Sequence, residues 1–180
     1  MKGIIFTEFL EMVETRFDPA MADRIIQAAQ LPSGGAYTAV GTYDHGEMWS
    51  LTAELSKATE ISVPDLLREF GHHLFGRLAI AFPRFVQGSG CAFDFLEKLN
   101  SVIHVEGRKL YSDAELPRFE VTERNAQRMV MIYRSKRHFA DLAEGLFQGC
   151  GRHFGERIEI RRDKLVAEDG SLVQFTLTRQ

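Results

Sequence analysis

Three hydrogen-bond donors recur at alternate positions in the short run IYRSKR. Tyr133, Ser135 and Arg137 carry a phenol, a hydroxyl and a guanidinium. Because side chains on a β-strand alternate between its two faces, these three would point the same way if the run were extended. Together they could bind a ligand that is rich in acceptor oxygens. The same spacing is also typical of an ordinary exposed strand face, and the spacing alone favours that simpler interpretation.

One of the six histidines has apolar neighbours on both sides. His104 lies within a helix predicted over residues 92–111, with Gly107 following it by one turn. The glycine leaves space in which a flat group could approach the imidazole closely. An imidazole in apolar surroundings with one open side is typical of an axial ligand of haem iron. By itself the feature is weak, since a histidine on an apolar helix is more often a hydrogen-bonded core residue.

Haem would explain both features at once. Its two propionates place four acceptor oxygens at one edge of an otherwise apolar disc, and burying them requires charge-assisted hydrogen bonds. Tyr133, Ser135 and Arg137 could supply those bonds while His104 holds the iron.

The length and composition fit a single domain that spans residues 1–180. At 44% hydrophobic, the chain can bury a core of its own. The net charge of −3 argues against a general nucleic-acid binder. The charge is uneven, since residues 1–75 carry 5 basic and 11 acidic side chains whereas residues 76–180 carry 17 and 14. The more basic part could meet an anionic group.

No segment has the pattern of a targeting signal or a membrane span. Glu8, Glu11 and Glu14 interrupt the apolar N-terminus, as in an amphipathic helix rather than a signal peptide. No run approaches the ~18 consecutive apolar residues that a spanning helix needs. Cys91 and Cys150 are far apart and lack a CxxC motif, so neither a zinc site nor a disulfide framework is indicated. We expect a cytoplasmic protein that binds no membrane.

The hydrophobic pattern changes its period along the chain. It is helical in the first part, and Ser62 with Pro64 and Asp65 marks a well-defined helix start. From residue 118 the period is two, which predicts strands. This order indicates an α+β fold in which one helix is inserted into an antiparallel sheet. The predicted helices cover residues 4–13, 21–30, 47–59, 62–82, 92–111 and 139–154, and the predicted strands cover 118–123, 127–135 and two or three segments of 157–179.

Motifs along the whole chain resemble those of the H-NOX family, the haem-nitric oxide/oxygen binding domains related to the haem domain of soluble guanylate cyclase. They are MKGIIF at the N-terminus, LREFG, IHVEGRKLYSDAELPRF, the Y-x-S-x-R pattern and AEGLFQG. The resemblance implies one H-NOX domain, of the stand-alone bacterial type. A helical distal subdomain (1–62) would be followed by a haem-ligating proximal subdomain (63–180) with a four-stranded antiparallel sheet. Haem b, iron protoporphyrin IX, would lie between the two subdomains.

The resemblance also assigns roles to individual residues. His104 would be the proximal ligand of the haem iron, and Tyr133, Ser135 and Arg137 would bind the propionates. Pro117 matches the proline that packs on the porphyrin and helps to distort it from planarity.

The residues on the distal side of the haem, where a gas would bind the iron, affect which gas the protein prefers. Oxygen-binding members of the family place a tyrosine on the inserted helix, and the corresponding position here is Leu142; residues 138–154 contain no tyrosine. Bound O2 gains from a hydrogen-bond donor, whereas NO and CO depend on one much less. We therefore expect a ferrous nitric oxide sensor that also binds CO, with His138 as the one nearby donor that could alter this preference. The remaining distal pocket residues are Ile5, Phe9, Leu74, Leu78 and Leu146.

Signalling is implied by the same resemblance. Nitric oxide would weaken the bond between iron and His104, the helix over 92–111 would relax, and the N-terminal part would rotate against the sheet-bearing part. Gly71 is a candidate pivot, although simple helix packing explains a glycine there equally well. The sequence shows no catalytic signature, so we expect no enzymatic activity and a separate effector, either a histidine kinase or a cyclic-di-GMP enzyme.

Three other functions compete with this hypothesis. One is an oxygen sensor on the same fold, which Leu142 disfavours. Another is a haem enzyme of peroxidase type, which would need a distal His/Arg pair that the predicted pocket lacks. The third is a binding module without iron, in which His104 is a core residue and Arg137 faces water or an anionic lipid.

Overall fold

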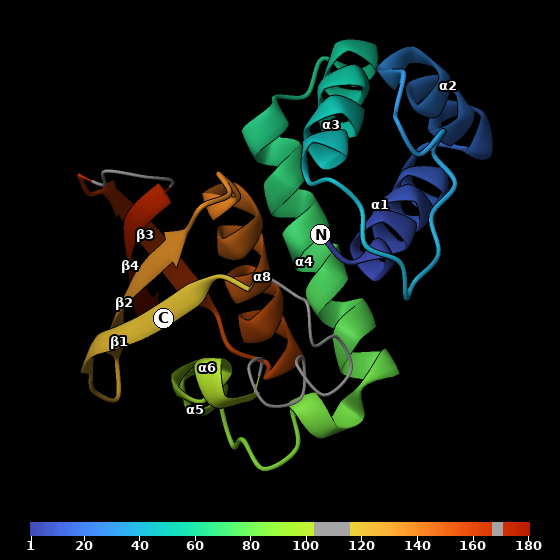
Figure 1. The fold of residues 1–180 in the computed structure, drawn as a ribbon. Coiled ribbons are helices and arrows are strands. Elements are labelled where there is room, and N and C mark those ends of the chain that lie inside the picture. The colour runs from blue at the N-terminus through green and yellow to red at the C-terminus, as the bar shows by residue number, and fades with distance from the viewer. Residues whose placement is uncertain (103–115, 167–170) are drawn as a thin grey trace.

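A computed structural model of the chain describes residues 1–102, 116–166 and 171–180. The fold is α+β, as predicted: helices come first, and a four-stranded antiparallel sheet follows. Figure 1 shows the N-terminal helices on one side of the molecule and the sheet on the other. Helices α4 (Val63–Ala81) and α8 (Ala140–His153) pack against each other between them.

The predicted N-terminal helices are confirmed. The Asp18 carboxylate caps the second one by accepting a hydrogen bond of 2.7 Å from the Met21 N–H, and Pro19 occupies its first turn. The apolar faces of the helices meet in one core, in which Phe6 and Val13 are fully buried. These helices are α1 (Gly3–Arg16), α2 (Pro19–Ala29) and α3 (Gly46–Thr59).

Helix α4 (Val63–Ala81) connects two hydrophobic cores. It begins as predicted, because the Ser62 hydroxyl accepts a hydrogen bond of 3.2 Å from the Asp65 N–H. It ends just before the short 3₁₀ helix η1 (Pro83–Phe85). Its buried side chains up to Leu74 belong to the N-terminal core, whereas Phe75 and Ala79 belong to the core beneath the sheet.

The single helix predicted over residues 92–111 is wrong in its described part. The structure has α5 (Ala92–Glu97) and then α6 (Leu99–Val102), separated at Lys98. Asn100 explains why the chain leaves a straight helical path. Its side-chain amide bonds the backbone of Phe119 at both the N–H and the C=O, which ties α6 to the start of the sheet. His104 lies outside the described residues.

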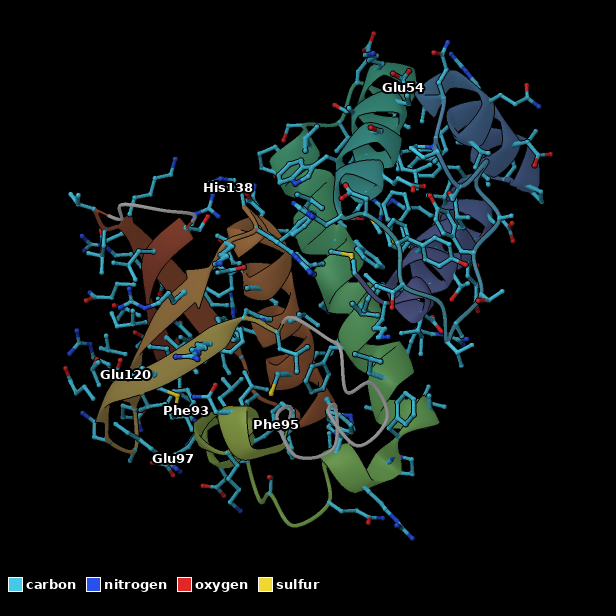
Figure 2. All side chains as sticks on the ribbon, viewed as in Figure 1. Glu54, Phe93, Phe95, Glu97, Glu120 and His138 are labelled. Atoms are coloured by element: carbon cyan, nitrogen blue, oxygen red, sulfur yellow. The ribbon has the colours of Figure 1, made fainter. Side chains whose placement is uncertain are left out.

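The sheet is antiparallel with the strand order β1-β2-β4-β3. Helix α8 (Ala140–His153) lies between β2 and β3 in the chain and packs on one face of the sheet, where Phe147 and Phe175 meet edge to face. Figure 2 shows Phe93 and Phe95 extending from α5 into the same region. The strands are β1 (Arg118–Arg124), β2 (Arg128–Ser135), β3 (Ile158–Lys164) and β4 (Ser171–Arg179).

Glycines allow α4 and α8 to approach at backbone distance. A Cβ atom at Gly71 would overlap the carbonyl oxygen of Leu142, and one at Gly145 would overlap the carbonyl oxygen of Arg68. Close packing is therefore a sufficient reason for a glycine at position 71.

Within the described ranges, no helix combines the length and the apolar character needed to cross a membrane.

Candidate functional site

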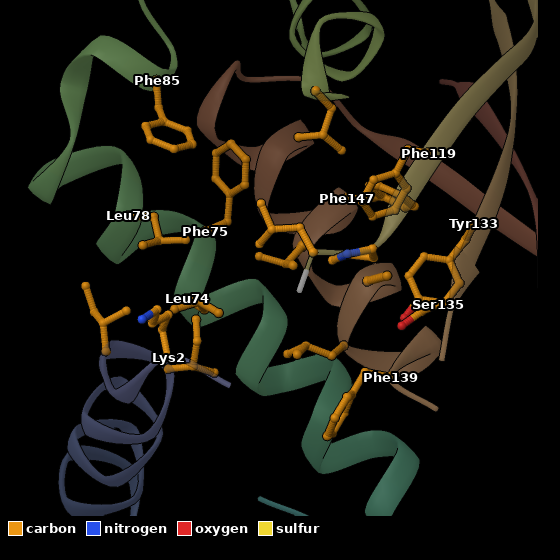
Figure 3. A pocket seen from close by; sticks show the side chains of 18 of the residues that line it. Lys2, Leu74, Phe75, Leu78, Phe85, Phe119, Tyr133, Ser135, Phe139 and Phe147 are labelled. Carbon is orange, nitrogen blue, oxygen red and sulfur yellow. The ribbon is translucent and has the colours of Figure 1, made fainter. Parts of the chain in front are cut away.

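A cavity of about 310 Å³ lies where the start of α1, the second half of α4, the first half of α8 and the adjoining ends of β1 and β2 meet. This volume is at the lower end of the roughly 300–1,000 Å³ that is usual for ligand pockets. Figure 3 shows Leu74, Phe75 and Leu78 directed into it from α4. Most of its lining is aliphatic or aromatic.

The structure gathers most of the predicted site residues around this one cavity. They come from segments far apart in the sequence: the start of α1, helix α4, the residue before β1, the end of β2 with the turn that follows it, and helix α8. The predicted residues that line the cavity are Ile5, Leu74, Leu78, Pro117, Tyr133, Ser135, Arg137, Leu142 and Leu146.

Tyr133 and Ser135 point into the cavity from the end of β2, as their alternating positions predict. Tyr133 is buried between Phe119 and Phe175, and its hydroxyl is hydrogen-bonded to Ser135. Burial raises the pKa of the Tyr133 phenol, so the hydroxyl remains protonated and available as a donor. Arg137 also lines the cavity, although β2 ends at Ser135.

The bend after β2 explains how Arg137 reaches the same place. Its backbone N–H donates a hydrogen bond of 3.0 Å to the Ser135 hydroxyl, which folds the chain back just beyond the strand. Strand alternation therefore accounts for Tyr133 and Ser135, and a local turn accounts for Arg137.

Two predicted residues are not placed at the cavity. Phe9 is fully buried within the N-terminal core, where it packs edge to face on Phe70 with ring centroids 5.1 Å apart, and it is not among the cavity-lining residues. His104 lies outside the described part of the chain, so its position relative to the cavity stays a prediction.

The side chains that helix α8 contributes to the cavity include no hydrogen-bond donor. Leu142 and Leu146 line it, and Tyr133 is the one tyrosine among the described lining residues. His138 does not line the cavity. It is exposed in the connection between β2 and α8 (Figure 2), with its Nδ1 atom 2.9 Å from the hydroxyl of Ser171.

Two polar residues of the cavity, Lys2 and Thr42, are not indicated by any motif in the sequence. They form an isolated antiparallel bridge, and the Lys2 Nζ donates a hydrogen bond of 2.7 Å to the Thr42 Oγ1. Forty positions separate them in the chain, so no local pattern could pair them. The one available signal was a lysine immediately before an apolar N-terminal helix.

The described lining fits a haem group. Ile5, Leu78 and Leu146 are apolar but only partly buried, because each faces the cavity, as expected for side chains that would pack on a flat apolar ligand. Tyr133 and Ser135 supply the donors that carboxylates require. Within 1–102, 116–166 and 171–180, no group of three or more His, Cys, Asp or Glu side chains could hold a bare metal ion.

Comparisons with known proteins agree with this geometry. Residues 2–162 match the family model described as Haem-NO-binding. The Fe(II) unliganded H-NOX protein from K. algicida is 40% identical, with a TM-score of 0.92 over 100% of this chain and 97% of that one. The H-NOX from Shewanella woodyi, solved in the Fe(II)CO ligation state, is 38% identical, with a TM-score of 0.83 over 100% of this chain and 95% of that one.

A third structure is similar in fold. The H-NOX protein from S. oneidensis in the Fe(II)NO ligation state is 24% identical and superposes with a TM-score of 0.91, over 100% of this chain and 99% of that one. Among curated protein sequences, no match was found. The family model and the two structures near 40% identity establish that this chain belongs to the H-NOX family, whose domains bind haem.

Proposed function

We propose that the protein is a sensor that binds nitric oxide at a ferrous haem and passes the signal to a separate protein. One observation carries the proposal: a single apolar cavity brings Tyr133, Ser135 and Arg137 together with an α8 face that offers Leu142 where a distal donor would be needed. When bound, haem supplies an iron atom that takes up diatomic gases.

The chain would hold the haem through three kinds of contact. Tyr133, Ser135 and Arg137 would receive the carboxylates, and Pro117 would pack on the ring face. His104 would provide the axial imidazole, which is the one iron ligand we assign to the protein.

Selectivity for nitric oxide over oxygen would follow from the α8 face of the cavity. Neither Leu142 nor Leu146 can donate a hydrogen bond, and bound O2 gains much more from a donor than NO or CO does. The CO ligation state of the S. woodyi H-NOX and the NO ligation state of the S. oneidensis H-NOX support these gases as ligands of this chain.

Transmission of the signal from the haem would begin at His104, which lies two residues after the end of α6 in the sequence. A change in its bond to iron would act on α6 and, through the Asn100–Phe119 contact, on the start of the sheet. Helices α4 and α8 join the sheet to the N-terminal helices, and Gly71 at their closest approach is the proposed pivot. The two proposed subdomains, 1–62 and 63–180, would rotate relative to each other.

The effector would be a separate histidine kinase or cyclic-di-GMP enzyme in the cytoplasm, and the sensor itself would catalyse no reaction.

Replacing the proposed iron ligand tests the haem assignment. His104→Ala should purify with little or no haem, and adding free imidazole should restore the Soret absorption, because imidazole can occupy the space of the missing side chain. His138→Ala is the matched control, since His138 is exposed and outside the cavity. A His104→Ala protein with the haem content and spectrum of the wild type would refute the role of His104.

A further inference from the structure

Strand β3 forms one edge of the sheet, because the order β1-β2-β4-β3 gives it a single strand neighbour among the described residues. Figure 1 shows β1 at the other edge. The register of β1 against β2 shifts between Val121 and Glu123, whereas β3 pairs with β4 without interruption. An irregularity of this kind protects an edge from pairing with another strand, so the regular edge at β3 is the one suited to such pairing.

The backbone groups of β3 point alternately toward β4 and toward the free edge. The Arg157 carbonyl accepts a hydrogen bond of 2.9 Å from the Gln180 N–H. At the other end, the Leu165 N–H donates to the Leu172 carbonyl at 2.9 Å. Odd-numbered residues therefore bond to β4, and the even-numbered ones direct their N–H and C=O groups to the free edge. The even-numbered residues are Ile158, Ile160, Arg162 and Lys164.

The side chains on the exposed face of β3 alternate in charge. Arg157, just before the strand, is followed at every second position by Glu159, Arg161 and Asp163. Arg161 is 78% exposed, and its contact with Asp163 is long at 3.4 Å, so both side chains can reach a second chain. Lysines often protect an edge strand, because their like charges repel a second copy. A row of alternating sign allows an antiparallel copy to place opposite charges side by side.

Backbone geometry and charge together select one register for such a pair. Two antiparallel copies of β3 can exchange hydrogen bonds only where even-numbered residues lie opposite even-numbered ones. Centring the pair on Ile160 meets this condition. It places Glu159 opposite Arg161 of the second copy, and Arg157 opposite Asp163 of the second copy. Moving the centre by one residue in either direction opposes like charges, and moving it by two keeps only half of the complementary pairs.

We infer that two copies of this chain form a homodimer through the free edges of β3, paired antiparallel about a two-fold axis at Ile160. The pairing would form about six backbone hydrogen bonds, because three residue pairs would each exchange two. On the face that α8 covers, Ile160 would meet Ile160 of the second copy beside the core. Arg162 on that face already contacts Asp141 at 2.6 Å, so it brings no unpaired charge into the contact.

The dimer should be weak and should leave the haem site unchanged. Pairing along a single strand buries little surface, so association should require micromolar or higher concentrations. No residue of β3 is among the described lining residues of the cavity. Haem content and dimer formation can therefore be measured independently, and a failure of one does not imply a failure of the other.

Reversing the charges on β3 tests both the dimer and its register. Sedimentation velocity of the haem-loaded protein would be recorded from about 1 to 200 µM. Glu159→Arg and Arg161→Glu should each self-associate at least about tenfold more weakly than wild type, because each opposes like charges at two positions. An equimolar mixture of the two variants should dimerise, since the arginines of one then face the glutamates of the other. The double variant Glu159→Arg/Arg161→Glu should dimerise like wild type.

Arg24→Glu, at an exposed position on α2, makes the same change in net charge as Arg161→Glu and is the matched control, which should dimerise like wild type. A wild type that stays monomeric throughout the range would refute the dimer. Single variants that keep the wild-type association, or a mixture that fails to associate, would refute pairing in this register. A variant that had merely lost stability would not be rescued by mixing, so recovery of the dimer in the mixture identifies the charge pairing itself.

Discussion

Leu142 is the residue on which the proposed gas preference depends. It lines the cavity near the start of α8 and is almost fully buried, so a polar group at this position would be held in a largely apolar environment. Hydrogen bonds are stronger in such surroundings than in water.

Leu142→Tyr should convert the protein into an oxygen binder. The phenol would supply the donor that the α8 face lacks, so the ferrous variant should form a stable oxygen complex in air. Leu142→Phe adds a ring without the hydroxyl and is the control. Absorption spectra in air would check this, and equal oxygen affinity in the two variants would contradict the assigned role of Leu142.

Local sequence patterns were sufficient to predict some of the cavity-lining residues but not others. Tyr133 and Ser135 were predictable because strand periodicity decides which face they share. Lys2 and Thr42 were not, because a pairing across forty residues depends on how the N-terminal segment folds back against the loop before α3. Phe9 was misplaced because helical spacing alone does not separate the cavity side of α1 from its core side.

The contact between α4 and α8 determines how the two halves of the fold are joined. Besides the glycines, Arg68 on α4 donates to Asp141 on α8 at 2.8 Å, and Arg162 on β3 contacts the same carboxylate at 2.6 Å. Burial raises the pKa of the nearby Glu144 carboxyl, while Arg162 and Arg68 lower it. The contacts among Arg68, Asp141 and Arg162 therefore link both helices to the sheet.

Gly71→Ala should weaken that contact. Its methyl group would overlap the backbone of α8 at Leu142, so we expect the free energy of unfolding to fall by about 1–3 kcal/mol. Gly76→Ala is a control on the same helix, because it is exposed and has open space around it. That variant should be stabilised by about 0.5–1 kcal/mol through helix propensity. Urea unfolding measures both, and an unchanged stability in Gly71→Ala would show that α4 and α8 can separate at little cost.

Most elements could be predicted from the sequence, because caps and periodicity are local features. Ser62 with Asp65 marks the start of α4, and the change to a period of two marks the sheet. The interruption at Lys98 could not be predicted in this way. Its cause, the pair of bonds between Asn100 and the backbone of Phe119, joins residues nineteen positions apart.

The whole molecule should be sensitive to mild acid. Burial lowers the pKa of His72 and His73 on α4, and the Glu8 carboxylate, 4.0 Å from His73, only partly offsets this for His73. The folded state therefore favours the neutral imidazoles. The stability that they contribute is present above their unfolded pKa of about 6.5 and is lost as the pH falls through their lower folded pKa.

His73→Gln should reduce this acid sensitivity. Thermal melting at pH 7.5 and pH 5.5 should show a smaller fall in Tm for the variant than for wild type, because one titrating group has been removed. Hydrogen bonds lower the pKa of the Asp65 and Asp94 carboxyls, so their contributions are lost only below about pH 3.9, outside this window. The same fall in Tm in both proteins would exclude His73 as a source.

The visible spectrum of the dithionite-reduced protein, recorded before and after exposure to air and then to nitric oxide, is the sharpest test of a haem that binds nitric oxide in preference to oxygen. We expect a Soret band that stays in place in air during the measurement and that shifts when nitric oxide is added. A stable oxygen complex would contradict the selectivity assigned to Leu142. The absence of a Soret band, even after reconstitution with haem, would contradict the proposed function itself.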